Sequence, residues 1–351
     1  MLNLHHRSYP FDEIKKSLGN GTSHHPAWQL AHDWLTGKKE FIFQTSGSTG
    51  IPKDLKFSRE KILASVKRTT EALKLSSKDH FLCCLSMQSV AGAMMLIRAV
   101  ELKATITVLE SNSKPLAQIS DAHPFTSLSL VPMQMHELPE HPAWMQKLDR
   151  FKTILIGGAT LNPNLEKLLM SCRAQVYQTY GMTETLSHIA LHRIGEQEAF
   201  HPLKGIEIKT DDRGCMCIKA DITNGEWLVT NDLVEILPDQ TFRLLGRADQ
   251  VINTGGHKVM PGKIEQAIGK YLHNKPFFIF GVPHSKFGEQ VTLFVEGKED
   301  KSIDKWWSKL DETLHQYEIP KQIIWMNMFH KTTSGKIDKA RTAKELQQAT
   351  A

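Results

Sequence analysis

Several features that would indicate a specialised class of protein are scarce or missing in this sequence. The five cysteines lack the even number and spacing of a disulfide framework, which favours reduced thiols and a cytoplasmic protein. The net charge of +5 is small, and basic residues are scattered among acidic ones, so no nucleic-acid partner is expected. The longest uncharged run, 81–97, is broken by glycine and serine, and the first residues lack the apolar core of a signal peptide. We therefore expect a globular protein without a membrane span.

One cysteine pair, Cys215 and Cys217, has the spacing of half a metal site. No second cysteine or histidine pair stands at ligand spacing elsewhere in the sequence. In an alternating strand both thiols would face one side, and we expect them to be structural.

Apolar strands alternate with helices between residues 41 and 191. This order predicts an α/β fold, with mixed or parallel sheets covered by helices. Ser58 is expected to cap one helix, and Pro163 to stand in the first turn of another that starts at Asn162. The expected strands cover 41–44, 81–85, 105–110, 126–130, 153–158 and 174–181, with a further helix over 90–102. The first forty residues give no strong prediction.

The pattern changes twice further along the chain. Short alternating strands around a DDRG turn predict a β-rich subdomain from about residue 205. After residue 250 strands and helices alternate again, with one helix expected over 304–315 and a charged helix at the end. We therefore predict a large N-terminal domain over 1–248 and a small, mobile α+β domain over 249–351.

The segment TSGSTGIPK, residues 45–53, has the composition of an anion-binding loop. Its glycines permit positive φ angles, and its backbone N–H groups and hydroxyls can surround an anion beside the Lys53 cation. The spacing does not match the G-x-x-x-x-G-K-[ST] loop of nucleoside triphosphatases. From these residues alone, a phosphate loop and a plain glycine–serine turn both remain open.

More polar motifs follow predicted strands, where ligands bind in open α/β sheets. The segment ILIGGA ends one strand in glycines, and YGMTE follows another. In that second motif a tyrosine could stack on a base, a threonine could donate to a phosphate, and Glu184 could bind Mg²⁺. Later, Asp232 could accept from a ribose diol, and TTSGKID forms a second glycine–lysine loop.

Together these motifs resemble the adenylate-forming superfamily of acyl-CoA synthetases, carrier-protein adenylation domains and luciferases. TSGSTGIPK resembles the phosphate loop of that superfamily and YGMTET its adenine and magnesium motif. GRADQVINTGGHKVMPGKIE resembles its hinge segment and TTSGKID its catalytic-lysine loop. The match is ordered from Thr45 to Lys339 and covers most of the chain.

The resemblance implies that ATP, Mg²⁺ and coenzyme A take part in an acyl transfer through an acyl-adenylate. Lys336 would bridge the substrate carboxylate and the α-phosphate, while Thr183 and Glu184 would reach the α-phosphate and Mg²⁺. Asp249 would be a hinge, and Gly255 and Gly256 would face the thiol in the second step. The implied ATP-binding residues are Thr45, Ser46, Gly47, Ser48, Thr49, Gly50, Lys53, Gly157, Gly158, Tyr180, Gly181, Asp232 and Arg247.

The sequence departs from the superfamily pattern at three places. Only 44 residues precede the phosphate loop, which implies a reduced N-terminal subdomain. Gln88 and Ser89 replace the usual aromatic–histidine step near the acyl pocket, which leaves the pocket's details open. The ribose motif reads Thr-Asn-Asp instead of Thr-Gly-Asp, although Asp232 is retained.

Within the superfamily, the sequence most resembles the o-succinylbenzoate–CoA ligases of menaquinone biosynthesis in their short form. The resemblance lies in SLVPMQMHEL, ILIGGA and TYGMTETLSHIA. The implied substrate is an aromatic dicarboxylate, whose spare carboxylate needs a polar or cationic partner in the pocket. The candidates are Ser89, Gln134, Ser187 and His188. Gln134 and His188 could instead be core polar groups satisfied by the backbone, and Ser89 could be a small residue tolerated by packing.

Two alternatives remain open at the level of the sequence. The chain could adenylate another aryl or acyl acid, or load a carrier protein in place of coenzyme A. It could also be a non-catalytic nucleotide-binding protein, although the full set of implied ATP-binding residues is present. The oligomeric state is not predicted.

Overall fold

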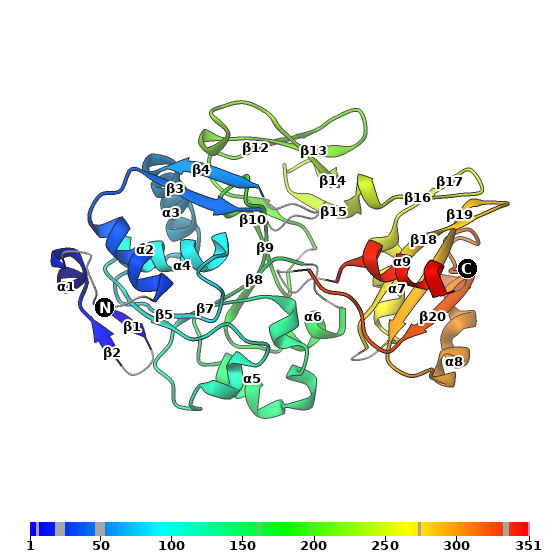
Figure 1. Ribbon diagram of the computed structural model, residues 1–351, viewed down its shortest axis with the longest axis horizontal. Helices are drawn as coiled ribbons and strands as arrows, with labels where there is room; N and C mark the ends of the chain where they lie inside the picture. Colours follow the sequence, from blue (N-terminus) through cyan, green and yellow to red (C-terminus); the bar gives the residue numbers. More distant parts are fainter. Residues whose placement is uncertain are drawn as a thin grey trace.

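The computed structural model describes residues 1–4, 7–17, 25–45, 53–159, 161, 163–196, 198–272, 275–332 and 337–349. Strands and helices are mixed throughout, so the predicted α/β class is confirmed (Figure 1). Within the described ranges, no helix is both long and apolar enough to cross a membrane.

A nine-stranded sheet has the order β11-β10-β9-β8-β7-β5-β6-β1-β2. Pairs from β1 through β6, β5, β7 and β8 to β9 are parallel, while β2, β10 and β11 are antiparallel to their neighbours. The carboxyl ends of β5, β7, β8 and β9 therefore lie along one edge of the sheet. The strands are β1 (Leu2–Leu4), β2 (Arg7–Tyr9), β5 (His80–Cys83), β6 (Thr105–Val108), β7 (Ser127–Leu130), β8 (Thr153–Ile156), β9 (Gln175–Gly181), β10 (His188–Arg193) and β11 (His201–Pro202).

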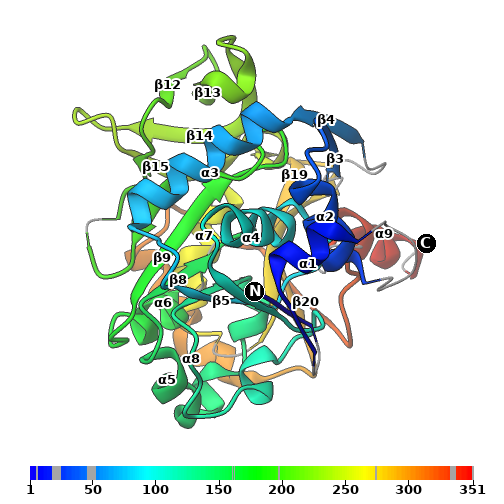
Figure 2. The same cartoon turned by 90° about the vertical axis from the view of Figure 1, so that its left-hand side faces the viewer.

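Helices cover both faces of this sheet, and each face has its own apolar core (Figure 2). Phe81 packs with residues of one core, whereas the adjacent Leu82 packs with the other, because successive strand side chains point to opposite faces. The first core includes α1 (Phe11–Lys16), α2 (Pro26–Leu35), α3 (Arg59–Leu73) and α4 (Val90–Glu101). The second includes α5 (Pro142–Leu148) and α6 (Pro163–Leu169).

The described residues among the first forty form more secondary structure than the sequence suggested. Leu2 pairs in parallel with Ile106 of β6, so β1 extends the large sheet. Trp28 and Trp34 of α2 are buried against α4 and its surroundings. A three-residue strand whose partner lies a hundred residues away has no local signal, which is why the sequence missed it.

Two smaller sheets accompany the large one, and the four-stranded sheet lies in the segment predicted to be β-rich from about residue 205. The hairpin β3 (Glu40–Gln44) and β4 (Asp54–Ser58) brackets the glycine loop. The second sheet contains β12 (Glu207–Thr210), β13 (Cys215–Lys219), β14 (Leu228–Ile236) and β15 (Phe242–Arg247). Both thiols of β13 are buried, and no cluster of three possible metal ligands occurs among the described residues.

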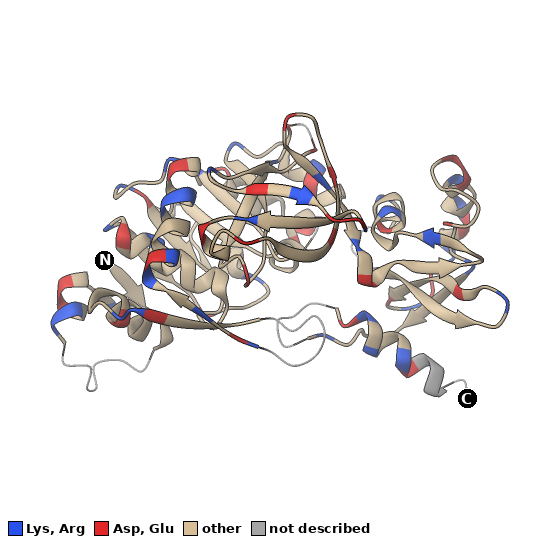
Figure 3. Ribbon diagram, turned by 90° about the horizontal axis from the view of Figure 1, so that it is seen from above, with Lys and Arg blue, Asp and Glu red and all other residues tan. Residues whose placement is uncertain are grey.

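The part of the chain after residue 251 forms a separate five-stranded sheet. These strands are β16 (Ile252–Thr254), β17 (His257–Val259), β18 (Phe277–His284), β19 (Gly288–Glu296) and β20 (Gln322–Met326), with helices α7 (Pro261–Gly269), α8 (Asp304–Trp307) and α9 (Lys339–Ala349). Single 3₁₀ turns are η1 (Pro115–Gln118), η2 (Pro132–Met135), η3 (Leu138–Glu140), η4 (Asp221–Thr223), η5 (Ala248–Gln250), η6 (Lys301–Ile303) and η7 (Ser308–Glu312). Figure 3 shows basic and acidic residues interspersed over the described part of the chain.

The predicted helix over 304–315 is wrong in its extent. The α-helix α8 stops at Trp307, and the chain continues as the 3₁₀ turn η7. Trp306 and Leu310 are nevertheless buried. Ser308 and Asp311 have weak helix propensity, which favours the tighter and shorter turn.

Candidate active site

Four loops meet at the carboxyl edge of the large sheet, where open α/β sheets bind their ligands. They follow β5, β7, β8 and β9, whose register is parallel and continuous. The motifs at Gly157 and at residues 181–188 therefore lie at the ends of neighbouring strands. The sequence predicted that each follows a strand, and the structure shows that the two strands are adjacent.

Glycine is required at two of these strand ends. A Cβ atom at Gly157 would overlap the hydroxyl of Thr179 on the adjacent strand. At Gly181 it would overlap the carbonyl oxygen of Ser187. Gly158 has a φ of +88°, a conformation that other residues rarely adopt. The backbones of β8 and β9 can consequently approach each other and a ligand closely.

The turn after β9 is held by Thr185, a residue that the sequence analysis did not select. Its hydroxyl accepts from Met182 N at 3.0 Å and lies 3.0 Å from Met182 O and 2.8 Å from Ser187 O. Thr183 is half-buried and Glu184 is exposed on this turn. Because Thr185 is itself buried, it fixes the backbone that presents both neighbours to solvent.

Tyr180 and Asp232 form a buried pair beside Arg247. The Tyr180 hydroxyl donates to Asp232 Oδ2 at 2.7 Å, and Arg247 Nη1 donates to Asp232 Oδ1 at 3.1 Å. Arg247 also donates two hydrogen bonds to Asp249, of 2.9 and 2.7 Å, which raise the pKa of the guanidinium. Burial and the Asp232 charge raise the pKa of Tyr180. The tyrosine ring packs on Phe242, so in this structure it is mostly covered.

The described ends of the glycine loop predicted to bind phosphate are held together by hydrogen bonds. Thr45 N donates to Lys53 O at 2.9 Å, and Lys53 N donates to the Thr45 hydroxyl at 3.0 Å. Lys53 is exposed at the end of this clamp. The five predicted residues between them, Ser46, Gly47, Ser48, Thr49 and Gly50, lie outside the described residues.

Two predicted elements belong to the C-terminal part. Lys336 lies outside the described residues, and its flanks are joined by a β-bridge between Lys331 and Ile337. Gly255 and Gly256 form the turn between β16 and β17, with φ angles of +56° and +84°. In Figure 1 this hairpin lies far from β8 and β9.

Two candidates for acid binding have structural partners in this structure. Ser89 caps α4, because its hydroxyl accepts from Gly92 N at 3.2 Å and donates to Ser86 O at 2.7 Å. Gln134 is buried, and its amide binds three backbone groups: Cys84 O, Asn112 O and Val131 N. These contacts match the structural alternative more closely than a role in binding substrate.

Of the other two candidates, Ser187 contacts a buried cation that the sequence analysis missed, and the pKa of His188 is affected by the charge of this cation. Arg98 of α4 donates to the Ser187 hydroxyl at 2.7 Å. His188 Nε2 lies 3.0 Å from the Thr69 hydroxyl, and burial together with two nearby guanidiniums lowers its pKa well below the usual value. The helix sequence MMLIRAVE resembles any buried helix, so the arginine gave no local signal.

Arg98 is unusual because it is 4% exposed and no salt bridge to it occurs among the described residues. Burial lowers its pKa to about 10, so it stays charged at neutral pH. An unpaired buried charge is costly, and an anionic ligand would offset that cost.

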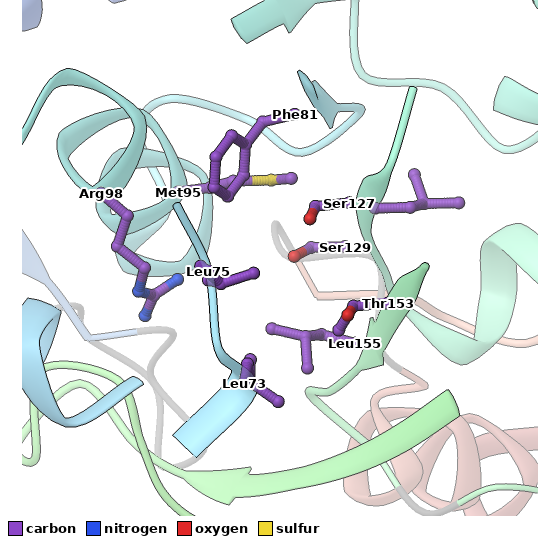
Figure 4. Close-up of a pocket in the computed structure, with 10 residues that line it drawn as sticks. Leu73, Leu75, Phe81, Met95, Arg98, Ser127, Ser129, Thr153 and Leu155 are labelled. Carbon is purple, nitrogen blue, oxygen red and sulfur yellow. The ribbon is translucent and has the colours of Figure 1, made fainter. Parts of the chain in front are cut away.

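A small cavity of about 10 Å³ adjoins Arg98, with room for roughly one water molecule. Figure 4 shows the hydroxyls of Ser127, Ser129 and Thr153 directed into the space between the strands and α4. Arg98 Nε and the hydroxyls of Ser127 and Thr153 have no hydrogen-bond partner within the described part of the chain. Three unsatisfied polar atoms around one cavity indicate a place for a polar group.

Glu184 suits a magnesium site in which the ion is bound partly by the protein and partly by the phosphates of a substrate. Mg²⁺ is usually held by one or two carboxylates together with substrate oxygens, so the exposed carboxylate of Glu184 has suitable chemistry.

Comparisons with known proteins agree with these motifs. A family model described as AMP-binding enzyme matches residues 31–233. The chain is similar to the 2-succinylbenzoate–CoA ligase of Listeria monocytogenes, with 26% identity covering 89% of this chain and 71% of that protein. It is also similar to the 2-succinylbenzoate–CoA ligase of Lactococcus lactis, with 27% identity covering 88% and 71%.

Solved structures give the same result for the fold. An acyl-CoA synthetase (AMP-forming)/AMP-acid ligase II-like protein of Dyadobacter fermentans is 35% identical, with a TM-score of 0.63, and the match covers 96% of this chain and 99% of that one. The o-succinylbenzoate coenzyme A synthetase of Bacillus subtilis, in complex with ATP and magnesium, has a TM-score of 0.74 at 20% identity, covering 86% and 69%.

Proposed function

The chain belongs to the AMP-binding enzyme family, and we propose that it is an acid–CoA ligase whose substrate is 2-succinylbenzoate. The reaction would join the acid to AMP with release of pyrophosphate, and then transfer the acyl group to coenzyme A with release of AMP. The relatives named 2-succinylbenzoate–CoA ligase support this substrate. Its product would serve menaquinone biosynthesis.

The observation that carries the substrate assignment is the buried, unpaired Arg98. 2-Succinylbenzoate has two carboxylates, and only one reacts with ATP. Arg98 can supply a cation for the other, with Ser187 beside it and the unsatisfied hydroxyls of Ser127 and Thr153 nearby. Ser187 stands three residues after Glu184, which connects this polar pocket to the nucleotide motif.

The adenylation step would depend on positioning and charge. The loop between Thr45 and Lys53 would hold the β- and γ-phosphates, and Asp232 and Arg247 would orient the ribose. Lys336 would neutralise the carboxylate oxygen as it attacks the α-phosphorus, because both reactants are anionic. Mg²⁺, held by Glu184, would stabilise the departing pyrophosphate. Thr183 would donate to the α-phosphate.

The thioester step would use a second arrangement of the C-terminal part. We propose that residues 249–351 form a mobile domain that rotates about Asp249 and carries Gly255 and Gly256 to the thiol. The exposed ion pair between Arg247 and Asp249 at η5 supports this position for a hinge, since it can break at little cost. A cytoplasmic location would suit the five unpaired cysteines.

A coupled assay with 2-succinylbenzoate, ATP, Mg²⁺ and coenzyme A tests the function. We expect AMP, pyrophosphate and a thioester in equal amounts, and Lys336→Ala should abolish ATP–pyrophosphate exchange. Exchange with another acid but not with 2-succinylbenzoate would reject the substrate and keep the reaction. Transfer to a carrier protein in preference to coenzyme A would favour the alternative acceptor. Binding of ATP without exchange for any acid in a panel would favour a non-catalytic nucleotide-binding protein.

Arg98→Met tests the substrate pocket directly. The KM for 2-succinylbenzoate should rise about 30-fold or more, since losing one partner of a buried charge pair costs about 2 kcal/mol or more. The KM for 3-benzoylpropionate, which lacks the ring carboxylate, should change little. Equal losses for both acids would mean that Arg98 supports the fold and does not select the substrate.

A further inference from the structure

His188 is a buried histidine to which the proposed reaction gives no task. Its ring lies between two hydroxyl groups, with Nε2 at 3.0 Å from Thr69 Oγ1 and Nδ1 at 3.4 Å from Ser187 Oγ. Thr69 belongs to α3 and is fully buried, while the Ser187 hydroxyl accepts from Arg98 of α4 at 2.7 Å. The side chains of Thr69, His188 and Ser187 therefore form one polar chain that ends at the guanidinium of Arg98.

The backbone is irregular on both sides of this serine–histidine pair. Leu186, directly before Ser187, is fully buried and has a φ of +66°, a conformation that a branched side chain rarely adopts. The pairing of β10 with β9 shifts its register between His188 and Ala190. Strained residues and register shifts occur often beside functional sites, where they redirect a side chain. The fold thus maintains the orientation of Ser187 and His188 against a local cost.

The imidazole of His188 is neutral at pH 7. Burial and the charges of Arg98 and Arg68 lower its pKa well below the usual value. A neutral imidazole has one donor and one acceptor nitrogen, so the polar chain has two arrangements. In the first, the Ser187 hydroxyl donates to Nδ1 and the Nε2 proton is donated to Thr69. In the second, the Thr69 hydroxyl donates to Nε2 and the Nδ1 proton is donated to Ser187.

The two arrangements differ in what Ser187 offers to a ligand. In the first, its only proton is used within the protein. In the second, its oxygen accepts from both Arg98 and His188, and its proton is free. An ionised carboxylate can only accept hydrogen bonds, so a carboxylate beside Arg98 favours the second arrangement.

We propose that Thr69 and His188 are positioning residues for the acid, which direct the Ser187 proton toward the carboxylate that does not react with ATP. The inference rests on the proposed function, which supplies an acid with a second carboxylate. The number of protons does not change when the acid binds. Nε2 loses one proton and Nδ1 gains one, while both hydroxyl groups keep theirs and rotate. The polar chain thereby adds a donor to the Arg98 cation and increases the preference for a dicarboxylate.

Thr69→Val tests the far end of the polar chain, because valine keeps the shape of the side chain and removes the donor to Nε2. The measured quantity is kcat/KM for 2-succinylbenzoate relative to 3-benzoylpropionate, which lacks the ring carboxylate. This ratio should fall about 10-fold, as expected when a hydrogen bond to a charged group is lost. Thr69→Ser should restore it. An unchanged ratio in Thr69→Val, with equal losses for both acids, overturns the positioning role.

Thr70→Val is the matched control in the same helix. The Thr70 hydroxyl is also buried but has no hydrogen-bond partner within the described residues. Its removal should leave the ratio between the two acids unchanged. A fall like that of Thr69→Val would assign the effect to the packing of α3 and overturn the proposal.

Two substitutions of His188 separate hydrogen bonding from volume. In His188→Asn the side-chain amide can take the place of Nδ1 and donate to Ser187, so most of the preference for 2-succinylbenzoate should remain. His188→Phe keeps a ring but has no donor, and the preference should be lost. Equal preference in both variants would overturn the proposal.

Nuclear magnetic resonance of the full chain with ¹⁵N-labelled histidine observes the polar chain without any reaction. The signal of His188, identified by its loss in His188→Asn, should change from the Nε2–H to the Nδ1–H form when 2-succinylbenzoate or phthalate is added. No change with either compound overturns the proposal. If no acid supports ATP–pyrophosphate exchange in the wild type, the proposed function fails, while the response to phthalate still decides whether the chain of side chains reacts to a carboxylate.

Discussion

At the scale of single residues, two side chains of the candidate site lie outside the motif residues that the sequence analysis selected. Their contacts in the folded protein show their roles. Arg98 lies within an apolar helix and Thr185 within a polar turn, and the sequence analysis selected neither. Arg98 is defined by burial without an acidic partner in the described structure. Thr185 is defined by three short contacts to the backbone around Thr183 and Glu184.

Thr185→Val tests the positioning role at this scale. Valine keeps the volume but leaves Met182 N and Ser187 O without their partner, which should reduce the free energy of unfolding by about 1–3 kcal/mol. The kcat for ATP–pyrophosphate exchange should fall about 10-fold through misplacement of Glu184, and Thr185→Ser should recover most of it. Urea denaturation and exchange assays measure both. Thr313→Val, at an exposed turn, is the matched control.

At the scale of elements, local signals and packing agree along most of the large sheet. Ser58 caps α3 as predicted, and α4 covers the predicted range almost to the residue. Gly92 in the first turn of α4 is required, because a Cβ there would overlap the carbonyl oxygen of Ser86. The start of α4 thus packs tightly on the loop after β5.

Ser89→Ala distinguishes a cap from a substrate ligand. Loss of the bond from Gly92 N should lower the free energy of unfolding by about 1 kcal/mol, with the KM for the acid unchanged. Ser89→Asp should retain the cap and the stability. Thermal or urea unfolding and steady-state kinetics provide the measurements. A raised KM at unchanged stability would instead restore Ser89 to the acid-binding set.

At the scale of the whole molecule, stability should depend on pH through buried histidines. Burial is the largest cause of a lowered pKa at His80, His123, His188 and His192, and at His188 two arginines add to it. In the unfolded chain these groups regain a pKa near 6.5. Below that pH the unfolded state binds protons that the native state does not, so stability falls as the pH falls.

We expect the free energy of unfolding to decrease between pH 7.5 and 5, with the contribution of His188 fully present above about pH 6.5. His188→Gln should reduce the slope below pH 6 by as much as about 1.4 kcal/mol per pH unit. His136→Gln, at an exposed position, should leave the slope unchanged. Urea titrations at several pH values provide the test, and an unaltered slope in His188→Gln would contradict it.

The sequence by itself determined the α/β class, the order of most strands and helices, and the family. These follow from short-range information: alternation of apolar residues, caps, and motifs in which glycine, lysine and carboxylates occur in a fixed order. The residues around Gly157 and Glu184 could be placed at strand ends because each motif directly follows its strand.

Only the tertiary structure determined which other residues lie beside those motifs. The pairing of β1 with β6, the tyrosine–aspartate–arginine contact at Tyr180, and the contact of Thr69 with His188 join segments that are distant in sequence. Arg98 illustrates the reason most clearly. The sequence identifies residue 98 as a basic residue. Only the packing of α4 against the sheet buries it, places it beside Ser187 and leaves it without an acidic partner in the described structure.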